Sequence, residues 1–184
     1  MALTRTRSAG FTMIEVLVSL LIIVIGILGM VALQSKAIPY TQDSVQRNTA
    51  MMLVDDLVEI IRTKGDDCTS GNNCLKAPGA SFPAAPATCI PTPTLLPDQI
   101  GCWAVRAGNA LPGATALLSS GNFFICRSVV PGDETVGSCA TTNATNTEVE
   151  IQVGWTVKQS ADCMAGSAST TPGVCTYRLR TRVR

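Results

Sequence analysis

Residues 11–33 read FTMIEVLVSLLIIVIGILGMVAL, the longest apolar run in the chain. From Val16 to Leu33 only Ser19 is polar. About 20 apolar residues are enough to cross a bilayer as a helix. The run therefore predicts one membrane-spanning helix close to the N-terminus.

The ten residues before this run, MALTRTRSAG, are polar and include Arg5 and Arg7. The positive-inside rule places these arginines in the cytoplasm and the rest of the chain outside. A secretory signal peptide would carry small residues at a cleavage site after a shorter apolar core. Here Ala9 and Gly10 precede the apolar run, so a cut after Gly10 would leave the membrane helix attached to the mature chain.

Helical periodicity continues beyond the membrane run. Apolar residues at helical spacing form one stripe: Ala50, Leu53, Val54, Leu57, Ile60 and Ile61. Pro39 should interrupt one hydrogen bond of the helix, and Gly65 is a suitable stop. We therefore expect one helix from about residue 12 to residue 64, of which only the second half can pack on a water-soluble domain.

The expected organisation has three parts. Residues 1–10 form a leader, and residues 11–38 form a membrane helix. Residues 39–184 form an outer domain that includes the helix up to about residue 64. No nucleic-acid partner is expected, because the net charge is only +1 and no basic field stands out.

The remaining segments predict loops and strands. Asp66–Asp98 is rich in proline and glycine and predicts a loop. Short apolar runs predict strands at Cys102–Ala107 and Phe123–Val130. Clean alternation of apolar and polar residues predicts two more strands, at Glu148–Lys158 and Tyr177–Val183. The sequence therefore favours an α+β fold, with one long helix on a small antiparallel sheet that has one wet face.

The last two predicted strands should pair as a hairpin. A register with Glu148 opposite Arg184 and Glu150 opposite Arg182 would match charges on the polar face. It would also keep the apolar side chains on the inner face: Val149, Ile151, Val153, Trp155, Leu179 and Val183.

All eight cysteines follow the apolar run, and this even count predicts disulfides in an oxidising compartment. A metal site is disfavoured, because the chain has no histidine and no C-x2-C pair. Connectivity does not follow from sequence, but short loops close at the least entropic cost. We therefore predict pairing of neighbours: Cys68–Cys74, Cys89–Cys102, Cys126–Cys139 and Cys163–Cys175.

Catalysis is not expected. Without histidine, Ser–His and Cys–His mechanisms are excluded. A membrane-tethered, disulfide-rich enzyme with paired carboxylates stays open as an alternative of another class, although the acidic residues follow strand faces and a helix surface. No cofactor is expected.

The segment from Gly10 to Leu20, GFTMIEVLVSL, resembles the type IV prepilin signature. In that family a membrane-embedded prepilin peptidase cuts after the glycine and methylates the new N-terminal amine. Phenylalanine commonly follows the cut, and glutamate is fifth in the mature chain. The resemblance implies cleavage between Gly10 and Phe11, N-methylation of Phe11, an assembly role for Glu15, and a type IV pilin-like fold.

The next segment, IGILGMVALQ at Ile25–Gln34, resembles the minor pilins called type IV pilus modification protein V. Gly26 and Gly29 stand where major pilins usually carry a proline. The resemblance implies a minor pilin that helps to initiate, or caps, a type IV pilus. The implied partners are prepilin peptidase, other minor pilins, the major pilin and the inner-membrane assembly platform. The implied location is the bacterial inner membrane, with the outer domain outside, and then the pilus.

Glu15 also has a physical interpretation of its own. A charge near mid-bilayer costs roughly 2.5–3.5 kcal/mol and usually has a partner. In a bundle of helices, the carboxylate of Glu15 could neutralise the Phe11 amine of a neighbouring subunit. The alternative is that Glu15 reaches the headgroups at the cytoplasmic end. A minor pseudopilin of type II secretion would share these features and is the nearest alternative function.

Overall fold

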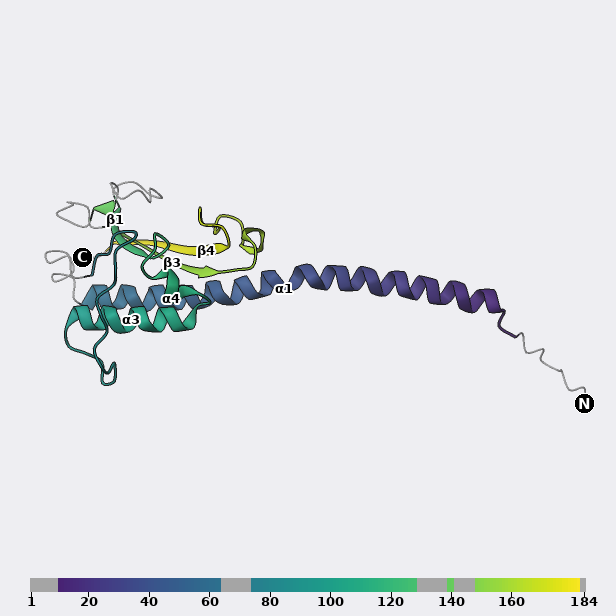
Figure 1. Cartoon of the computed structure of the whole chain (residues 1–184), viewed down its shortest axis with the longest axis horizontal. Coiled ribbons are helices and arrows are strands. Elements are labelled where there is room, and N and C mark those ends of the chain that lie inside the picture. The colour runs from purple at the N-terminus through teal and green to yellow at the C-terminus, as the bar shows by residue number, and fades with distance from the viewer. Residues whose placement is uncertain (1–9, 64–73, 129–138, 141–147, 183–184) are drawn as a thin grey trace, which may run out of the picture. The chain divides into compact units, whose positions relative to one another are not determined.

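The computed structural model describes residues 10–63, 74–128, 139–140 and 148–182 (Figure 1). Contacts within the chain define two compact units, Met1–Pro39 and Tyr40–Arg184. We call the second unit the head. Helix α1 spans Met13–Thr63 and contributes to both units.

Helix α1 confirms the predicted long helix. Its first turn is capped by Thr12, whose backbone and side-chain oxygens accept the Glu15 amide proton at N···O distances of 3.1 and 3.4 Å. Pro39 lies inside the helix without ending it. Within the head, the predicted stripe of α1 is buried except for Ile60, which is only partly buried. Val58, which the prediction did not include, is buried as well.

The head contains a four-stranded antiparallel sheet in the order β2-β1-β3-β4. Its strands are β1 (Phe124–Ser128), β2 (Cys139–Ala140), β3 (Glu148–Thr156) and β4 (Val174–Arg182). The apolar face of β3 packs into the core with the α1 stripe, since Val149, Ile151, Val153 and Trp155 are all buried. The described parts thus form an α+β, pilin-like fold with a long N-terminal helix and a small antiparallel sheet.

A second helix replaces one predicted strand. Helix α3 spans Leu96–Ala110, so the strand prediction for Cys102–Ala107 is wrong. A short apolar run does not distinguish strand from helix. The spacing of the buried residues Ile100, Trp103 and Ala107 is helical, and they pack in the core. Figure 1 shows α3 alongside the second half of α1.

The start of α3 also shortens the predicted loop, which ends at Leu95 rather than at Asp98. Within the described residues 74–95, the chain makes one β-bridge, between Lys76 and Ile125. The loop packs closely on α3 at Gly101, where a Cβ would lie 2.8 Å from the Ala84 carbonyl oxygen. A short helix, α4 (Ala114–Leu117), follows α3.

The hairpin of β3 and β4 has a different register from the predicted one. Glu148 pairs with Arg182 and Glu150 pairs with Arg180, two residues away from the expected partners. A two-residue shift keeps every side chain on its face, whereas a one-residue shift would not. The paired strands end at Thr156 and Val174, and the segment between them contains the 3₁₀ helix Ser160–Asp162. The observed register also pairs opposite charges, since Glu148 contacts Arg180 and Arg182. Charge matching therefore does not by itself choose between the two registers.

The prediction that one face of β3 is exposed to water is also wrong. Glu150 and Gln152 are 3% and 2% exposed, respectively. The guanidinium of Arg178 lies across this face, 3.1 Å from a Glu150 oxygen, and donates to Gln152 Oε1 at 3.0 and 2.6 Å. Its Cζ lies 5.7 Å from the centroid of the Phe124 ring. The long arginine side chain therefore covers the face that alternation alone assigns to solvent.

Candidate functional site

The junction between Gly10 and Phe11 lies just before α1, in a segment without helix or strand. The Phe11 side chain is 81% exposed. A Cβ added to Gly10 would meet no atom within 4 Å. Among the residues that the structure describes, packing therefore does not require glycine at residue 10. Cleavage and methylation here stay predictions.

Glu15 lies in the first turn of α1, where a carboxylate interacts favourably with the positive end of the helix dipole. Its amide is held by the Thr12 cap, and its carbonyl accepts the Ser19 hydroxyl at 2.6 Å. Within the part of the chain that the structure describes, the Glu15 carboxylate is exposed and makes no hydrogen bond or ion pair. The backbone around Glu15 is thus held by local hydrogen bonds. An assembly role for Glu15 stays a prediction.

The apolar residues between Phe11 and Leu33 are all exposed. By length and composition, α1 is able to cross a membrane, and none of its most apolar window is buried. A soluble core helix would bury such residues against its own domain. The apolar side chains of this segment can be removed from water only by contact with lipid or with another helix.

Disulfides fasten two loops of the head. The bonds Cys89–Cys102 and Cys163–Cys175, which the sequence analysis predicts, are present, with Cα–Cα distances of 5.8 and 5.5 Å. Cys74 and Cys126 are disulfide-bonded as well. The predicted bonds Cys68–Cys74 and Cys126–Cys139 stay predictions, because Cys68 and the Cys139 side chain lie outside the described part of the chain.

A buried carboxylate joins α1 to the rest of the head. Both oxygens of Asp43 accept hydrogen bonds, one from Trp155 Nε1 at 3.1 Å and one from the Met164 amide at 3.0 Å. Asp43 is 2% exposed. This role of Asp43 was not predicted from the sequence, because an acidic side chain on a helix is normally exposed to solvent. Its contacts fix α1 to β3 and to the loop that the Cys163–Cys175 disulfide closes.

Lys76 is a second buried ionisable side chain, and it was not predicted from the sequence. Its Nζ donates to the Phe123 carbonyl at 2.5 Å and lies 4.9 Å from the centroid of the Phe82 ring. Burial lowers the pKa of Lys76 from 10.5 to about 8. Burial also lowers the pKa of Arg178. Burial in the head accounts for both shifts.

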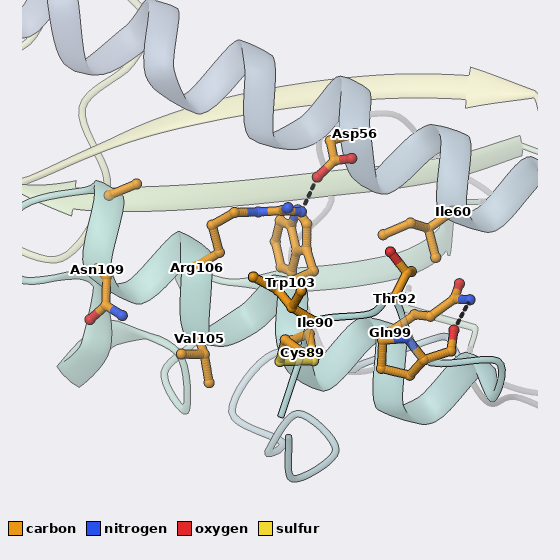
Figure 2. A pocket seen from close by; sticks show the side chains of 13 residues that line it. Asp56, Ile60, Cys89, Ile90, Thr92, Gln99, Trp103, Val105, Arg106 and Asn109 are labelled. Atoms are coloured by element: carbon orange, nitrogen blue, oxygen red, sulfur yellow. Dashed lines mark hydrogen bonds and ion pairs between the residues drawn. A yellow bond between two sulfur atoms is a disulfide. The ribbon is translucent and has the colours of Figure 1, made fainter. Parts of the chain in front are cut away.

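A cavity of about 680 Å³ lies between α1 and α3 (Figure 2). Asp56 of α1 and Arg106 of α3 form an ion pair across it. Apolar parts of its lining come from Ile60, Ile90 and Val105. This cavity was not predictable from the sequence pattern, because it depends on α3, part of which was predicted to be a strand.

Metal-ligating side chains do not cluster in the described residues. No cluster of three or more His, Cys, Asp or Glu side chains able to hold a metal ion occurs among them. The expectations of no metal, no cofactor and no enzymatic activity stay predictions.

The comparisons with known proteins concern the N-terminal segment. Residues 5–31 match the family model of the prokaryotic N-terminal methylation motif. The match includes Gly10, Phe11 and Glu15. Curated proteins and solved structures gave no match. The chain therefore carries the type IV prepilin leader signal, which indicates a type IV pilin-like or pseudopilin protein, points to a structural subunit, and implies processing by prepilin peptidase and assembly with other pilins.

Proposed function

We propose that the chain is a minor pilin that helps to initiate, or caps, a type IV pilus. The observation that carries this proposal is the match of residues 5–31 to the N-terminal methylation motif, together with an apolar helix that is exposed between Phe11 and Leu33. Such a helix fits membrane anchoring before assembly and burial among other helices afterwards. The likeness of Ile25–Gln34 to minor pilins gives the finer role.

Glu15 is the residue that we expect to guide assembly. Cleavage would create a positive amine at Phe11, and methylation would leave that amine charged. Among the described residues the carboxylate of Glu15 makes no ion pair or hydrogen bond, and an unpaired charge in an apolar bundle is costly. A neighbour's Phe11 amine would remove this cost only when the two helices lie at the correct axial offset. The charge pair would therefore set the register of the growing filament.

The partners and location follow from this role. Prepilin peptidase would process the leader, and the inner-membrane assembly platform would receive the mature chain. Other minor pilins and the major pilin would contact it through their N-terminal helices. The head would lie outside the inner membrane before assembly and on the pilus afterwards.

A minor pseudopilin of type II secretion is the second candidate, because the methylation motif is common to both groups. Deletion separates the two. If the chain is a pilus subunit, its deletion should reduce the number of pili and leave secretion intact. If the chain is a pseudopilin, its deletion should impair secretion and leave the pili intact.

The leader assignment is tested on protein from the native membrane. Intact mass and N-terminal sequencing should show a chain that begins at Phe11 with a methylated amine. A chain that still begins at Met1, or that is cut after Leu33, would overturn the proposed function.

A further inference from the structure

The Cys163–Cys175 disulfide connects the two groups that hold the buried carboxylate of Asp43. Cys163 directly precedes Met164, whose amide donates to one Asp43 oxygen at 3.0 Å. Cys175 lies opposite Trp155 in the hairpin of β3 and β4, and directly opposite side chains share one face of a sheet. The indole of Trp155 donates to the other Asp43 oxygen at 3.1 Å. One covalent bond therefore keeps both hydrogen-bond donors close together.

The segment that carries Met164 has little contact with the core of its own. Of residues 158–166, all of which the structure describes, Cys163 alone is buried, and Met164 is 41% exposed. Cys175, to which Cys163 is bonded, is fully buried. A segment with so little buried apolar surface opens at a low free-energy cost. The disulfide and the contact with Asp43 are therefore what attach this segment to the core.

Helix α1 depends on the same two donors in its first turns within the head. Asp43 is buried there, ahead of the apolar stripe that begins at Ala50. A buried carboxylate that loses a hydrogen bond is destabilised, so loss of the Met164 amide favours withdrawal of Asp43 into water. Farther along α1, the Leu53 carbonyl accepts from Trp103 of α3 at 2.8 Å, a contact that does not involve the disulfide. The first turns can thus be released while the later turns stay packed.

We propose that oxidation of Cys163 and Cys175 is the step that attaches the first turns of α1, at residues 40–47, to the head. Forming the bond removes two electrons and two protons from the two thiols. A disulfide-bonded oxidoreductase takes them up and becomes a dithiol, and reduction by a dithiol reverses the exchange. In the reduced chain, the segment with Met164 leaves the core and Asp43 is solvated. The fold thereby contains a redox-sensitive attachment of α1.

Reduction of the full chain in detergent tests this coupling from the side of Asp43. Because the disulfide is buried, dithiothreitol reaches it only when residues 158–166 open. Asp43→Ala removes a contact that opposes opening, so Cys163–Cys175 should be reduced about ten-fold faster than in the wild type, as alkylation and peptide mass mapping measure. Cys89–Cys102 spans 13 residues against 12 and is the internal control, whose rate should not change. Equal rates in variant and wild type, or equal acceleration of both disulfides, would overturn the inference.

Hydrogen exchange tests the coupling from the side of the disulfide. The double change Cys163→Ala and Cys175→Ala should speed amide exchange at residues 41–48 of α1 about ten-fold and leave residues 53–61 as in the wild type. Cys89→Ala with Cys102→Ala is the matched control and should leave both stretches unchanged. Unchanged exchange at residues 41–48 in the first variant would overturn the inference. Equal acceleration in both stretches would also overturn it, because the whole head would then depend on the bond.

Discussion

Between Met13 and Leu33, and again between Ala50 and Ile61, helix α1 is rich in aliphatic side chains, yet the two stretches meet opposite surroundings. The first stretch is exposed along its whole length. The second places its apolar stripe in the core of the head. The difference is one of pattern, because apolar residues surround the first stretch on all sides and follow only one face of the second. One helix therefore serves two purposes, and changes in its two halves should have separable effects.

The largest loss of head stability should come from Ile151→Asp. Ile151 is fully buried on β3, so the variant places an unpaired carboxylate in the core. We expect the free energy of unfolding of the head to fall by more than about 4 kcal/mol, enough to abolish a stable head. Thermal melts of the full chain in detergent measure it. Arg182→Ser is the control, since its side chain is 60% exposed, and it should cost less than about 0.5 kcal/mol. Equal losses would mean that the faces of the hairpin are misassigned.

Asp43→Ala should have the next largest effect. It leaves the indole of Trp155 and the amide of Met164 without their acceptor. Hydrogen bonds to a buried charged group contribute about 1.5–3 kcal/mol each, so we expect a loss of roughly 2–4 kcal/mol. The exposed Asp55→Ala on the same helix should change the melting curve little. Similar curves for the two variants would show that Asp43 does not fix α1 to the hairpin.

The pH dependence of the head should report Lys76. Its pKa is lowered from 10.5 to about 8 in the folded chain, so the unfolded chain binds more protons between these values. The free energy of unfolding should therefore rise with pH from about 8 to 10.5, by roughly 1–3 kcal/mol. Denaturant titrations across this range measure the rise. Lys76→Met should remove it, while Lys158→Met at an exposed position should keep it. A flat wild-type profile would contradict the prediction.

The smallest effect on head stability belongs to Glu15→Gln. Glu15 lies in the other unit, so the melting temperature of the head should stay unchanged. Recovery of the chain in sheared filaments should nevertheless fall about ten-fold, because the charge pair with a neighbour is worth roughly 1–2 kcal/mol or more in an apolar bundle. Glu59→Gln, an exposed change on the head's part of α1, is the control. Wild-type recovery of the Glu15→Gln chain in filaments would contradict an assembly role for the Glu15 carboxylate.

Sequence patterns predicted the long helix well, because the signals for it are local. A single apolar segment from Val16 to Leu33 forms a helix in lipid, because a helix makes all its backbone hydrogen bonds within the segment. The stripe from Ala50 to Ile61 repeats at helical spacing. The strands β1, β3 and β4 likewise followed from short apolar runs and alternation. Prediction was wrong at Cys102–Ala107, where a short, mostly apolar run fits either a strand or one side of a helix.

The sequence by itself determined the prepilin leader signal, which part needs lipid or other helices, and which face of each strand is apolar. These properties depend on residue order within a few turns or on side-chain alternation. Only the tertiary structure decided the two-residue register of the hairpin, the burial of Glu150 under Arg178, the attachment of Asp43, and the cavity lined by α1, α3 and the loop at residues 89–93. Each of these joins residues far apart in the chain, and their contacts are selected by packing of the whole head rather than by any local preference.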